Sequence, residues 1–578
     1  MRGVKERKNS MKKYRKPAVF RRALSVFLAA ASFAALLGGC GNGSVRTERN
    51  EETLSYEDAE AEINSMMKKI QVTEVENPTL DIYSDEMSEA DVLADIDTFP
   101  VTTTGDGEVN IEIAAATELS SEAPDDWINV VARNFNEAGI TVGGKKATVS
   151  VRKITSGEVV TYINADAYHP HMFIPSNDAW GKMLEISQPG IEKIADRLAG
   201  NTAGILIQND VYESFIEKYK EPTVANVLEA TLAGDLLFAY TNPYTSSTGL
   251  NILTAMLKAF DETNPLSGKA QDKLLEYQQS SPPVAYTTAV LRNQASKGVI
   301  NAMVMEEQAY INTPELADYV YIPAGIRHDH PAYIFDYCTA EERETALKFV
   351  EYCQNEESQK LASDRGFNRH DEYVSQDTGM NGLEYITAQK VWKKNKNGGK
   401  PIIAVFVADV SGSMSGEPLN SLKSSLIGAS SYIGSDHYIG LVSYSSDVTV
   451  NLPIGQFDAK QKAYFSGEVK NLSEGGSTAT YDALLVALNM LNEKAKEVPD
   501  AKLMLFVLSD GEQNEGYSLK RVTPIVAGMQ VPVYTIGYNY ADENGELSIL
   551  SGINEAASLN ATSDDIANQL RNLFNVTV

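Results

Sequence analysis

The chain has 578 residues, with 50 Lys or Arg against 78 Asp or Glu and a formal net charge of -28 at pH 7. At roughly 100–200 residues per domain, this length excludes a single small domain and predicts about three or four folding units. A content of 43% hydrophobic and 22% charged residues is typical of a soluble globular chain, and the excess negative charge makes nucleic acid a poor candidate partner.

The first forty residues have the pattern of an export signal. Residues 1–22 hold ten Lys or Arg and one acidic residue, and an apolar stretch, residues 23–37, follows them. This stretch is shorter than the ~20 residues that a membrane-spanning helix needs. The run Leu37-Gly38-Gly39-Cys40 resembles the lipobox of a bacterial lipoprotein signal. The resemblance implies that residues 1–39 are removed and that a lipid on Cys40 anchors the mature chain to the cell membrane, facing outside the cytoplasm; an uncleaved N-terminal anchor is the alternative.

Composition divides the exported part into four segments. Residues 40–106 are acidic and weakly apolar, so we expect a tether with at most one short helix near Tyr56 to Ile70. In residues 107–375 strand-like runs alternate with helix-like ones, which predicts an α/β domain with mainly parallel sheets. Residues 376–398 break this pattern and are expected to be a linker with a possible helix. A second α/β unit is expected at residues 399–578.

The body of the chain contains two cysteines. Cys338 and Cys353 flank a segment of helix-forming composition. At 1.5 Å per residue the two sulfurs are expected about 20 Å apart, beyond the reach of a disulfide. We therefore expect two buried free thiols.

Oxygen-bearing side chains gather at predicted strand ends in the second unit. Asp409, Ser411 and Ser413 directly follow an apolar strand, Thr478 lies in a Gly-rich loop, and Asp510 follows a later strand. In an open α/β sheet the carboxyl ends of neighbouring strands form one crevice, so these loops can meet there. Two carboxylates and two or three hydroxyls, without nitrogen or sulfur, suit Mg2+ or Mn2+. A cluster of helix caps and turns without metal is the alternative.

This pattern, Asp409-x-Ser411-x-Ser413 with Thr478 and Asp510, resembles the von Willebrand factor type A (VWA) domain and its metal-ion-dependent adhesion site (MIDAS). The resemblance covers about residues 399–578 and implies a doubly wound, Rossmann-like fold. It also implies that the two serines and the threonine bind the metal directly while the two aspartates act mostly through waters. An acidic residue of a protein partner would complete the metal's coordination.

The first unit carries hydroxyl clusters at two turns between a strand and a helix. Ser120 and Ser121 follow the first strand, and Ser247 and Thr248 follow a later one. Two such turns far apart in sequence are what a two-lobed ligand cleft requires, since free backbone N–H groups lie beside the hydroxyls there. Ordinary capping serines are the alternative. Glu118, beside the first pair, disfavours a small anion as ligand.

Residues 107–375 resemble a bacterial extracellular solute-binding protein of the type 2 periplasmic-binding fold, in the branch of molybdate and other oxyanion receptors. The stretches that carry the resemblance are Phe173 to Trp180, Thr241 to Asn251 and Asp329 to Ile334. The resemblance implies two lobes that close on a solute by a hinge, with the four hydroxyls as candidate contacts. The solute is a small molecule or a peptide.

The leading hypothesis is a membrane-anchored extracellular lipoprotein, not an enzyme, whose VWA domain binds an adhesion partner through Mg2+ and lies away from the membrane. The alternative is the substrate receptor of an ABC-type importer with an accessory VWA domain. An enzyme is disfavoured because no nucleophile-base pair or phosphate loop occurs in a usable context. The histidine pairs at 169/171 and 328/330 could form a zinc site, but a structural role is favoured.

Overall fold

The computed structural model describes residues 54–81, 93–280, 300–510, 513–538 and 545–554, with short pieces at 282–285, 291–292, 295, 556, 558–561, 570 and 573–574. The predicted signal peptide and the predicted lipidation site, Cys40, lie outside these residues. Among the helices in the described segments, none has the length and apolar character that crossing a bilayer requires.

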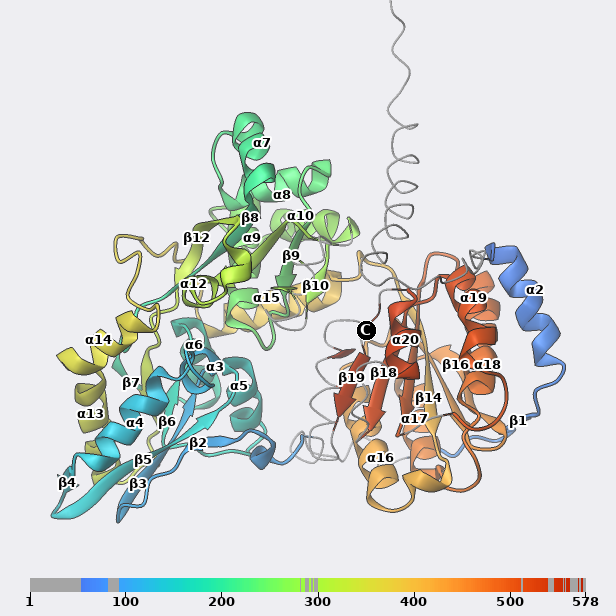
Figure 1. Cartoon of the computed structure of the whole chain (residues 1–578), viewed down its shortest axis with the longest axis horizontal. Coiled ribbons are helices and arrows are strands. Elements are labelled where there is room, and N and C mark those ends of the chain that lie inside the picture. The colour runs from blue at the N-terminus through green and yellow to red at the C-terminus, as the bar shows by residue number, and fades with distance from the viewer. Residues whose placement is uncertain are drawn as a thin grey trace, which may run out of the picture. The chain divides into compact units, whose positions relative to one another are not determined.

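Residues 93–364 form a domain of two lobes, each built on its own sheet (Figure 1). Lobe 1 has the strand order β2-β5-β3-β6-β13-β7, and β4 pairs with β5. Its sheet is mixed rather than mainly parallel, because β13 runs antiparallel to both of its neighbours. Its strands are β2 (Val101–Thr103), β3 (Val109–Ala115), β4 (Thr141–Val142), β5 (Lys145–Lys153), β6 (Met172–Ile174), β7 (Glu192–Ala195) and β13 (Ala332–Ile334). Its helices are η3 (Ile96–Thr98), α3 (Thr117–Ser120), α4 (Trp127–Glu137), α5 (Ser156–Asn164), α6 (Asp178–Ser187), α13 (Ala340–Cys353) and α14 (Glu356–Asp364).

Lobe 2 has the strand order β10-β9-β11-β8-β12 and is also mixed, since β8 runs antiparallel to β11 and β12. The chain enters lobe 2 through residues 196–201 and returns to lobe 1 through residues 328–331. Its strands are β8 (Thr202–Gln208), β9 (Phe238–Thr241), β10 (Val284–Ala285), β11 (Ala302–Glu306) and β12 (Tyr319–Arg327). Its helices are α7 (Asn209–Tyr219), α8 (Val224–Ala233), α9 (Ser247–Phe260), α10 (Gly268–Gln279), α12 (Glu307–Ile311) and η4 (Pro314–Leu316).

Cys338 and Cys353 are free, as expected. Cys353, the last residue of α13, is buried, whereas Cys338 is only partly buried because it precedes the helix at the edge of the core.

The segment expected as a linker contains helix α15 (Gly382–Asn395), which packs against both lobes. Tyr385 lies in a core cluster with Trp180 of lobe 1, while Trp392 lies in the core of lobe 2. The Trp392 indole donates a hydrogen bond of 2.8 Å to the Tyr240 hydroxyl of β9. The apolar face of α15 was not recognised when the segment was expected to be a linker. Because this face packs on both lobes, the helix is part of the two-lobed domain.

The C-terminal domain is a doubly wound α/β unit with strand order β1-β16-β15-β14-β17-β18-β19. Every pair in this sheet is parallel except β15 with β16. Alternate residues of the central strand β14 face two separate cores: Phe406 packs toward α16 and α17, and Val405 packs toward α18 and α19. The strands are β14 (Ile402–Asp409), β15 (Tyr438–Tyr444), β16 (Val448–Gln456), β17 (Lys502–Ser509), β18 (Val533–Tyr538) and β19 (Ser558–Ala561). The helices are η5 (Gly412–Met414), α16 (Glu417–Ser430), α17 (Ala459–Asn471), α18 (Thr480–Glu497), α19 (Leu519–Met529) and α20 (Glu546–Gly552).

Part of the expected tether completes this domain. Helix α2 (Tyr56–Met67) packs on α18 and α19, and strand β1 (Val72–Glu74) pairs in parallel with β16 at the edge of the sheet (Figure 1). Ala59, Ile63 and Met66 are buried in the core that also contains α18. These three residues form a narrow apolar stripe on an otherwise polar helix, so the acidic composition of the segment did not indicate that it packs. The two-lobed domain is therefore inserted between β1 and β14 of the C-terminal domain.

Replacing Ile63 by Ala should lower the free energy of unfolding of the C-terminal domain by about 2–5 kcal/mol, because it opens a cavity in a packed core. The measurement is denaturant unfolding of the chain from Gly41 onward. Asn64→Ala, at an exposed position of the same helix, is the matched control. Equal stabilities of the two variants would contradict the packing of α2 on the domain.

Candidate functional site

Three loops meet at the carboxyl edge of the C-terminal sheet. β14 and β17 are parallel neighbours, with Ala408 opposite Leu508, so Asp409 and Asp510 leave the sheet at the same edge. The Gly-rich loop is held beside them by two backbone hydrogen bonds, from Gly475 N–H to the Val410 carbonyl (2.8 Å) and from Gly412 N–H to the Gly476 carbonyl (3.2 Å).

Four of the residues predicted as metal ligands, Asp409, Ser411, Ser413 and Asp510, are linked by hydrogen bonds in these loops. Ser413 Oγ donates to Asp510 Oδ1 at 2.9 Å and lies 3.1 Å from Ser411 Oγ. Asp409 Oδ1 accepts from the Ser411 backbone N–H at 2.8 Å. Thr478 is buried, and its backbone N–H donates to the Asn514 side chain at 2.9 Å. Thr478 lies in the adjoining Gly-rich loop, and the binding of a metal by these five residues stays a prediction.

Asp409 is completely buried and strongly hydrogen-bonded. Its Oδ2 accepts from the Ser509 hydroxyl (2.6 Å) and from the Tyr444 hydroxyl (3.3 Å). Burial, with the Asp409 charge nearby, raises the pKa of Asp510. Two close carboxylates and three hydroxyls form a set of hard oxygen donors that a divalent cation would neutralise. Ser509 and Tyr444 were not predicted as part of the site, although both occupy the last position of a strand at this edge.

The four hydroxyls predicted for the two-lobed domain do not form a single hydrogen-bonded cluster. Ser120 Oγ donates to the carbonyls of Ala115 and Ala116, and Ser121 Oγ donates to the Thr117 carbonyl. Both hydroxyls therefore bond to the backbone of the turn that contains them. Thr248 Oγ1 bonds with neighbouring hydroxyls of lobe 2 at 2.9 and 3.0 Å.

Of the four, Ser247 is the one whose hydroxyl joins the lobes. It lies at the start of α9 in lobe 2, and its Oγ donates to Ser176 Oγ of lobe 1 at 2.9 Å. It also accepts from the Trp180 indole at 2.9 Å.

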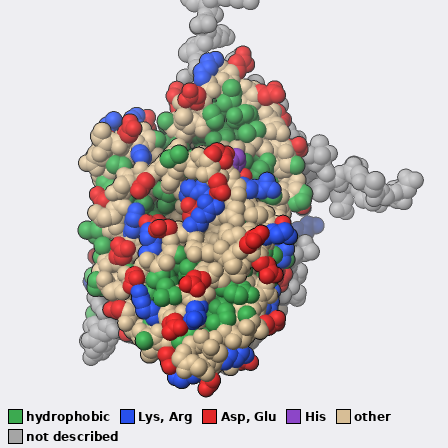
Figure 2. Space-filling model, turned by 90° about the vertical axis from the view of Figure 1, so that its left-hand side faces the viewer, with side chains coloured by type: hydrophobic (Ala, Val, Ile, Leu, Met, Phe, Trp, Pro, Cys, Tyr) green, Lys and Arg blue, Asp and Glu red, His purple; other side chains and the backbone are tan. Residues whose placement is uncertain are grey.

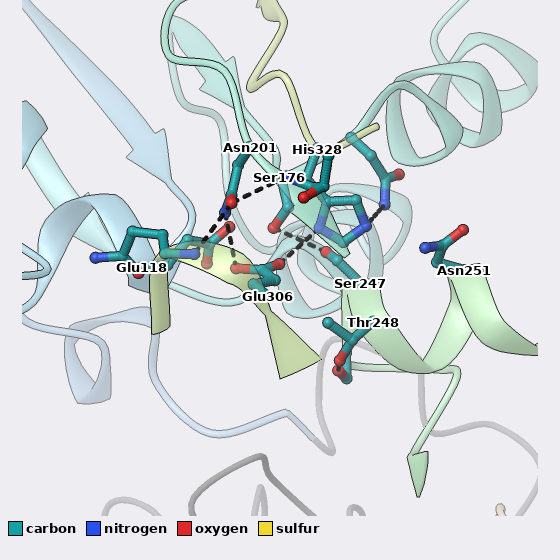
Figure 3. A network of polar contacts seen from close by, with 12 residues as sticks. Glu118, Ser176, Asn201, Ser247, Thr248, Asn251, Glu306 and His328 are labelled. Atoms are coloured by element: carbon teal, nitrogen blue, oxygen red, sulfur yellow. Dashed lines mark hydrogen bonds and ion pairs between the residues drawn. The ribbon is translucent and has the colours of Figure 1, made fainter. Parts of the chain in front are cut away.

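A buried polar network extends from this contact, and Figure 3 shows its side chains pointing toward one another. Asn177 Nδ2 lies 3.1 Å from His328 Nε2, and His328 Nδ1 lies 2.6 Å from Glu306 Oε1. His330 bonds through Nδ1 to the Ala199 carbonyl (2.8 Å) and through Nε2 to Glu118 Oε1 (3.2 Å). The chain crossings between the lobes thus supply the two histidines. Sequence analysis noted both but gave them no partner.

The hydrogen bonds fix the state of His328. Asn177 Oδ1 accepts from the Ala179 N–H, so its Nδ2 donates to His328 Nε2, and the ring must carry its proton on Nδ1. Burial lowers the pKa of His328 to about 3, so the ring stays neutral. Within the described ranges, no three His, Cys, Asp or Glu side chains are grouped closely enough to hold a metal ion.

The contribution of His328 to the stability of the two-lobed domain should therefore fall on acidification. The unfolded chain takes up a proton on this histidine near pH 6.5 while the folded state does not, so stability falls as pH drops below 6.5. Between pH 6.5 and 5 this contributes about 2 kcal/mol. Urea unfolding at both pH values should show a smaller loss for His328→Gln than for the wild type, and an unchanged loss for the exposed control His169→Gln. Identical pH dependence in all three proteins would refute the assignment.

The molecular face drawn in Figure 2 carries acidic and basic side chains interspersed with small apolar patches.

Comparison with known proteins assigns both domains. Residues 404–576 match the family model of the von Willebrand factor type A domain, and residues 117–368 match that of the bacterial extracellular solute-binding protein. Both are binding-type domains. The resemblance of the two domains to these families and the fold class expected from sequence are thereby confirmed.

Individual relatives are distant. The inter-alpha-trypsin inhibitor heavy chain H1 of Sus scrofa is 28% identical over 205 residues, which cover 33% of this chain and 21% of that protein. The chain thus spans about a fifth of the length of the curated relatives it matches. A von Willebrand factor type A structure from Catenulispora acidiphila has 18% identity and a TM-score of 0.28, covering 30% of this chain and 42% of that one. The sulfate-binding protein SubI from Mycobacterium tuberculosis H37Rv has 14% identity and a TM-score of 0.33, covering 46% and 88%.

Proposed function

Because the chain combines an extracellular solute-binding domain with a von Willebrand factor type A domain, we propose that it is an exported, lipid-anchored binding protein whose C-terminal domain captures protein partners through Mg2+ or Mn2+. The proposal includes no catalytic role: the carboxylates at the sheet edge would act as metal ligands, which would leave no evident general base.

The convergence of Asp409, Ser411, Ser413, Thr478 and Asp510 at one sheet edge is the observation that supports the proposal most. The hydroxyls of Ser411, Ser413 and Thr478 would hold the ion directly, and the two carboxylates would balance its charge through water. When bound, the ion would supply a positive centre for an acidic side chain of the partner. The Ser413–Asp510 hydrogen bond already holds two of the donors together.

The proposed lipid on Cys40 would tether the chain to the membrane by way of the C-terminal domain, because α2 packs on that domain. Residues 41–54 separate Cys40 from Ser55, the residue before α2, so the tether would reach at most roughly 50 Å at ~3.5 Å per residue.

A peptide array tests the proposed activity. We expect the chain from Gly41 onward to retain peptides that contain Asp or Glu in Mg2+ but not in EDTA, and Asp409→Asn to retain none. Asp500 is an exposed residue that precedes β17, at the end of the strand opposite to Asp510, so Asp500→Asn should bind like the wild type. Retention that is equal in Mg2+ and EDTA would refute metal-dependent capture.

The importer receptor is a second candidate, favoured by the solute-binding match over residues 117–368. Under this alternative the chain from Gly41 onward would bind a free solute, and Asp409→Asn would not affect that binding. A neighbouring permease gene would support it.

A further inference from the structure

The Glu118 carboxylate lies where hydrogen-bond donors of lobe 1 and of the segment that joins the lobes converge. It comes from α3 of lobe 1, and its side chain is only 14% exposed. It accepts hydrogen bonds from the Ser176 hydroxyl and from His330, whose ring is completely buried. A buried carboxylate is costly unless such donors surround it, so the position is built for a negative charge.

The donors form a chain that points toward this carboxylate. The Trp180 indole donates to Ser247, Ser247 donates to Ser176, and Ser176 donates to Glu118. This chain of hydrogen bonds begins at Trp180 of lobe 1, passes through Ser247 of lobe 2 and returns to lobe 1. Hydrogen bonds aligned in one direction polarise one another and strengthen the last bond to an anion.

The charge balance supports the same assignment. Burial opposes a charge on His330, but the hydrogen bond and charge of Glu118 outweigh it and raise the pKa of His330. Burial alone would raise the pKa of Glu118, but His330 and Ser176 hold it below its usual range. His330 also keeps a left-handed backbone (φ 48°), which is sterically costly and persists only where side-chain contacts fix it.

We propose that Glu118 is a built-in anionic ligand of the two-lobed domain: its carboxylate fills the site between the lobes and holds them closed without a free solute. A free oxyanion meets repulsion from the charge of Glu118. The inference depends on the solute-binding assignment of this domain and is independent of the metal site. It disfavours the importer alternative.

Chemical rescue tests the built-in ligand. In the chain from Gly41 onward, Glu118→Ala should lower the melting temperature of the two-lobed domain, and millimolar formate, acetate or sulfate should restore it relative to chloride. The wild type should not respond to these anions. Glu118→Gln fills the same volume without the charge and should be destabilised without rescue. Glu122→Ala, an exposed acid in the same loop, is the matched control.

A second measurement covers the case in which Glu118→Ala fails to fold. Fluorescent dyes placed at exposed Glu137 of lobe 1 and Glu217 of lobe 2 report lobe closure by energy transfer. We expect one closed population of the wild type in solute-free buffer, unchanged by sulfate or acetate. An open wild type that closes on adding either anion, or a Glu118→Ala variant as stable as Glu122→Ala, would overturn the proposal. The Mg2+ response of the same samples reports the metal site separately.

Discussion

Replacing Asp409 by Ala should destabilise the C-terminal domain by roughly 3 kcal/mol or more in EDTA and should abolish its stabilisation by Mg2+. The variant leaves three buried donors, Ser411 N–H, the Ser509 hydroxyl and the Tyr444 hydroxyl, without their acceptor. Each unsatisfied buried group costs about 1–3 kcal/mol. A bound ion adds ~2.7 kcal/mol at a hundredfold excess over Kd, and the variant lacks the carboxylate that would balance its charge.

Asp409→Asn separates the two effects. It keeps an oxygen acceptor of the same shape but has no charge, so it should retain much of the stability in EDTA and still lose the Mg2+ response. Thermal unfolding of wild type and both variants, in EDTA and in millimolar Mg2+, provides the comparison. A full Mg2+ response in Asp409→Asn would mean that the ion binds elsewhere.

Replacing Trp392 by Ala should destabilise the two-lobed domain by about 3–5 kcal/mol. The indole is completely buried in the core of lobe 2, and its loss also removes the hydrogen bond to Tyr240. The chain should show two unfolding transitions, one for each domain. Because α15 packs on the lobes, the variant should lower the midpoint of the transition that Mg2+ does not stabilise. Denaturant unfolding with and without Mg2+ identifies which transition shifts.

Two variants control this result. Trp392→Phe keeps an aromatic ring in the core and should cost less than the Ala variant, and Leu383→Ala removes a side chain that is 58% exposed on the same helix and should have little effect. If Trp392→Ala left both transitions unchanged, residues 376–398 would be a linker after all.

Part of the candidate metal site was predictable because three of its residues are close in sequence. Asp409, Ser411 and Ser413 follow an apolar strand at spacings of two, and parallel strands bring Asp510 to the same edge. Thr478, rather than Ser477, was chosen because it lies four residues before Asp482, as in the family that the motif resembles. The packing around the group, such as the Tyr444 hydroxyl on Asp409, depends on the register of β15 against β14 and left no signal in the sequence.

Long-range packing accounts for what the sequence did not reveal. Helix α2 is acidic on its exposed face and buries only a narrow stripe, so its composition resembles that of a tether although Ile63 is a core residue. The polar network between the lobes joins Glu118 to His330, 212 positions later in the chain. Ser120 and Ser121 were expected as ligand contacts, but the close carbonyls of their own turn accept their hydrogen bonds.

Direct counting of bound metal tests the central claim most sharply. Mn2+ titrated into the chain from Gly41 onward, with free Mn2+ followed by electron paramagnetic resonance, should show one bound ion per chain that Mg2+ displaces. Asp409→Asn should lose that ion, and Asp500→Asn should keep it. A wild type that binds no Mn2+ at millimolar concentration, or an Asp409→Asn variant that binds it equally well, would contradict the account.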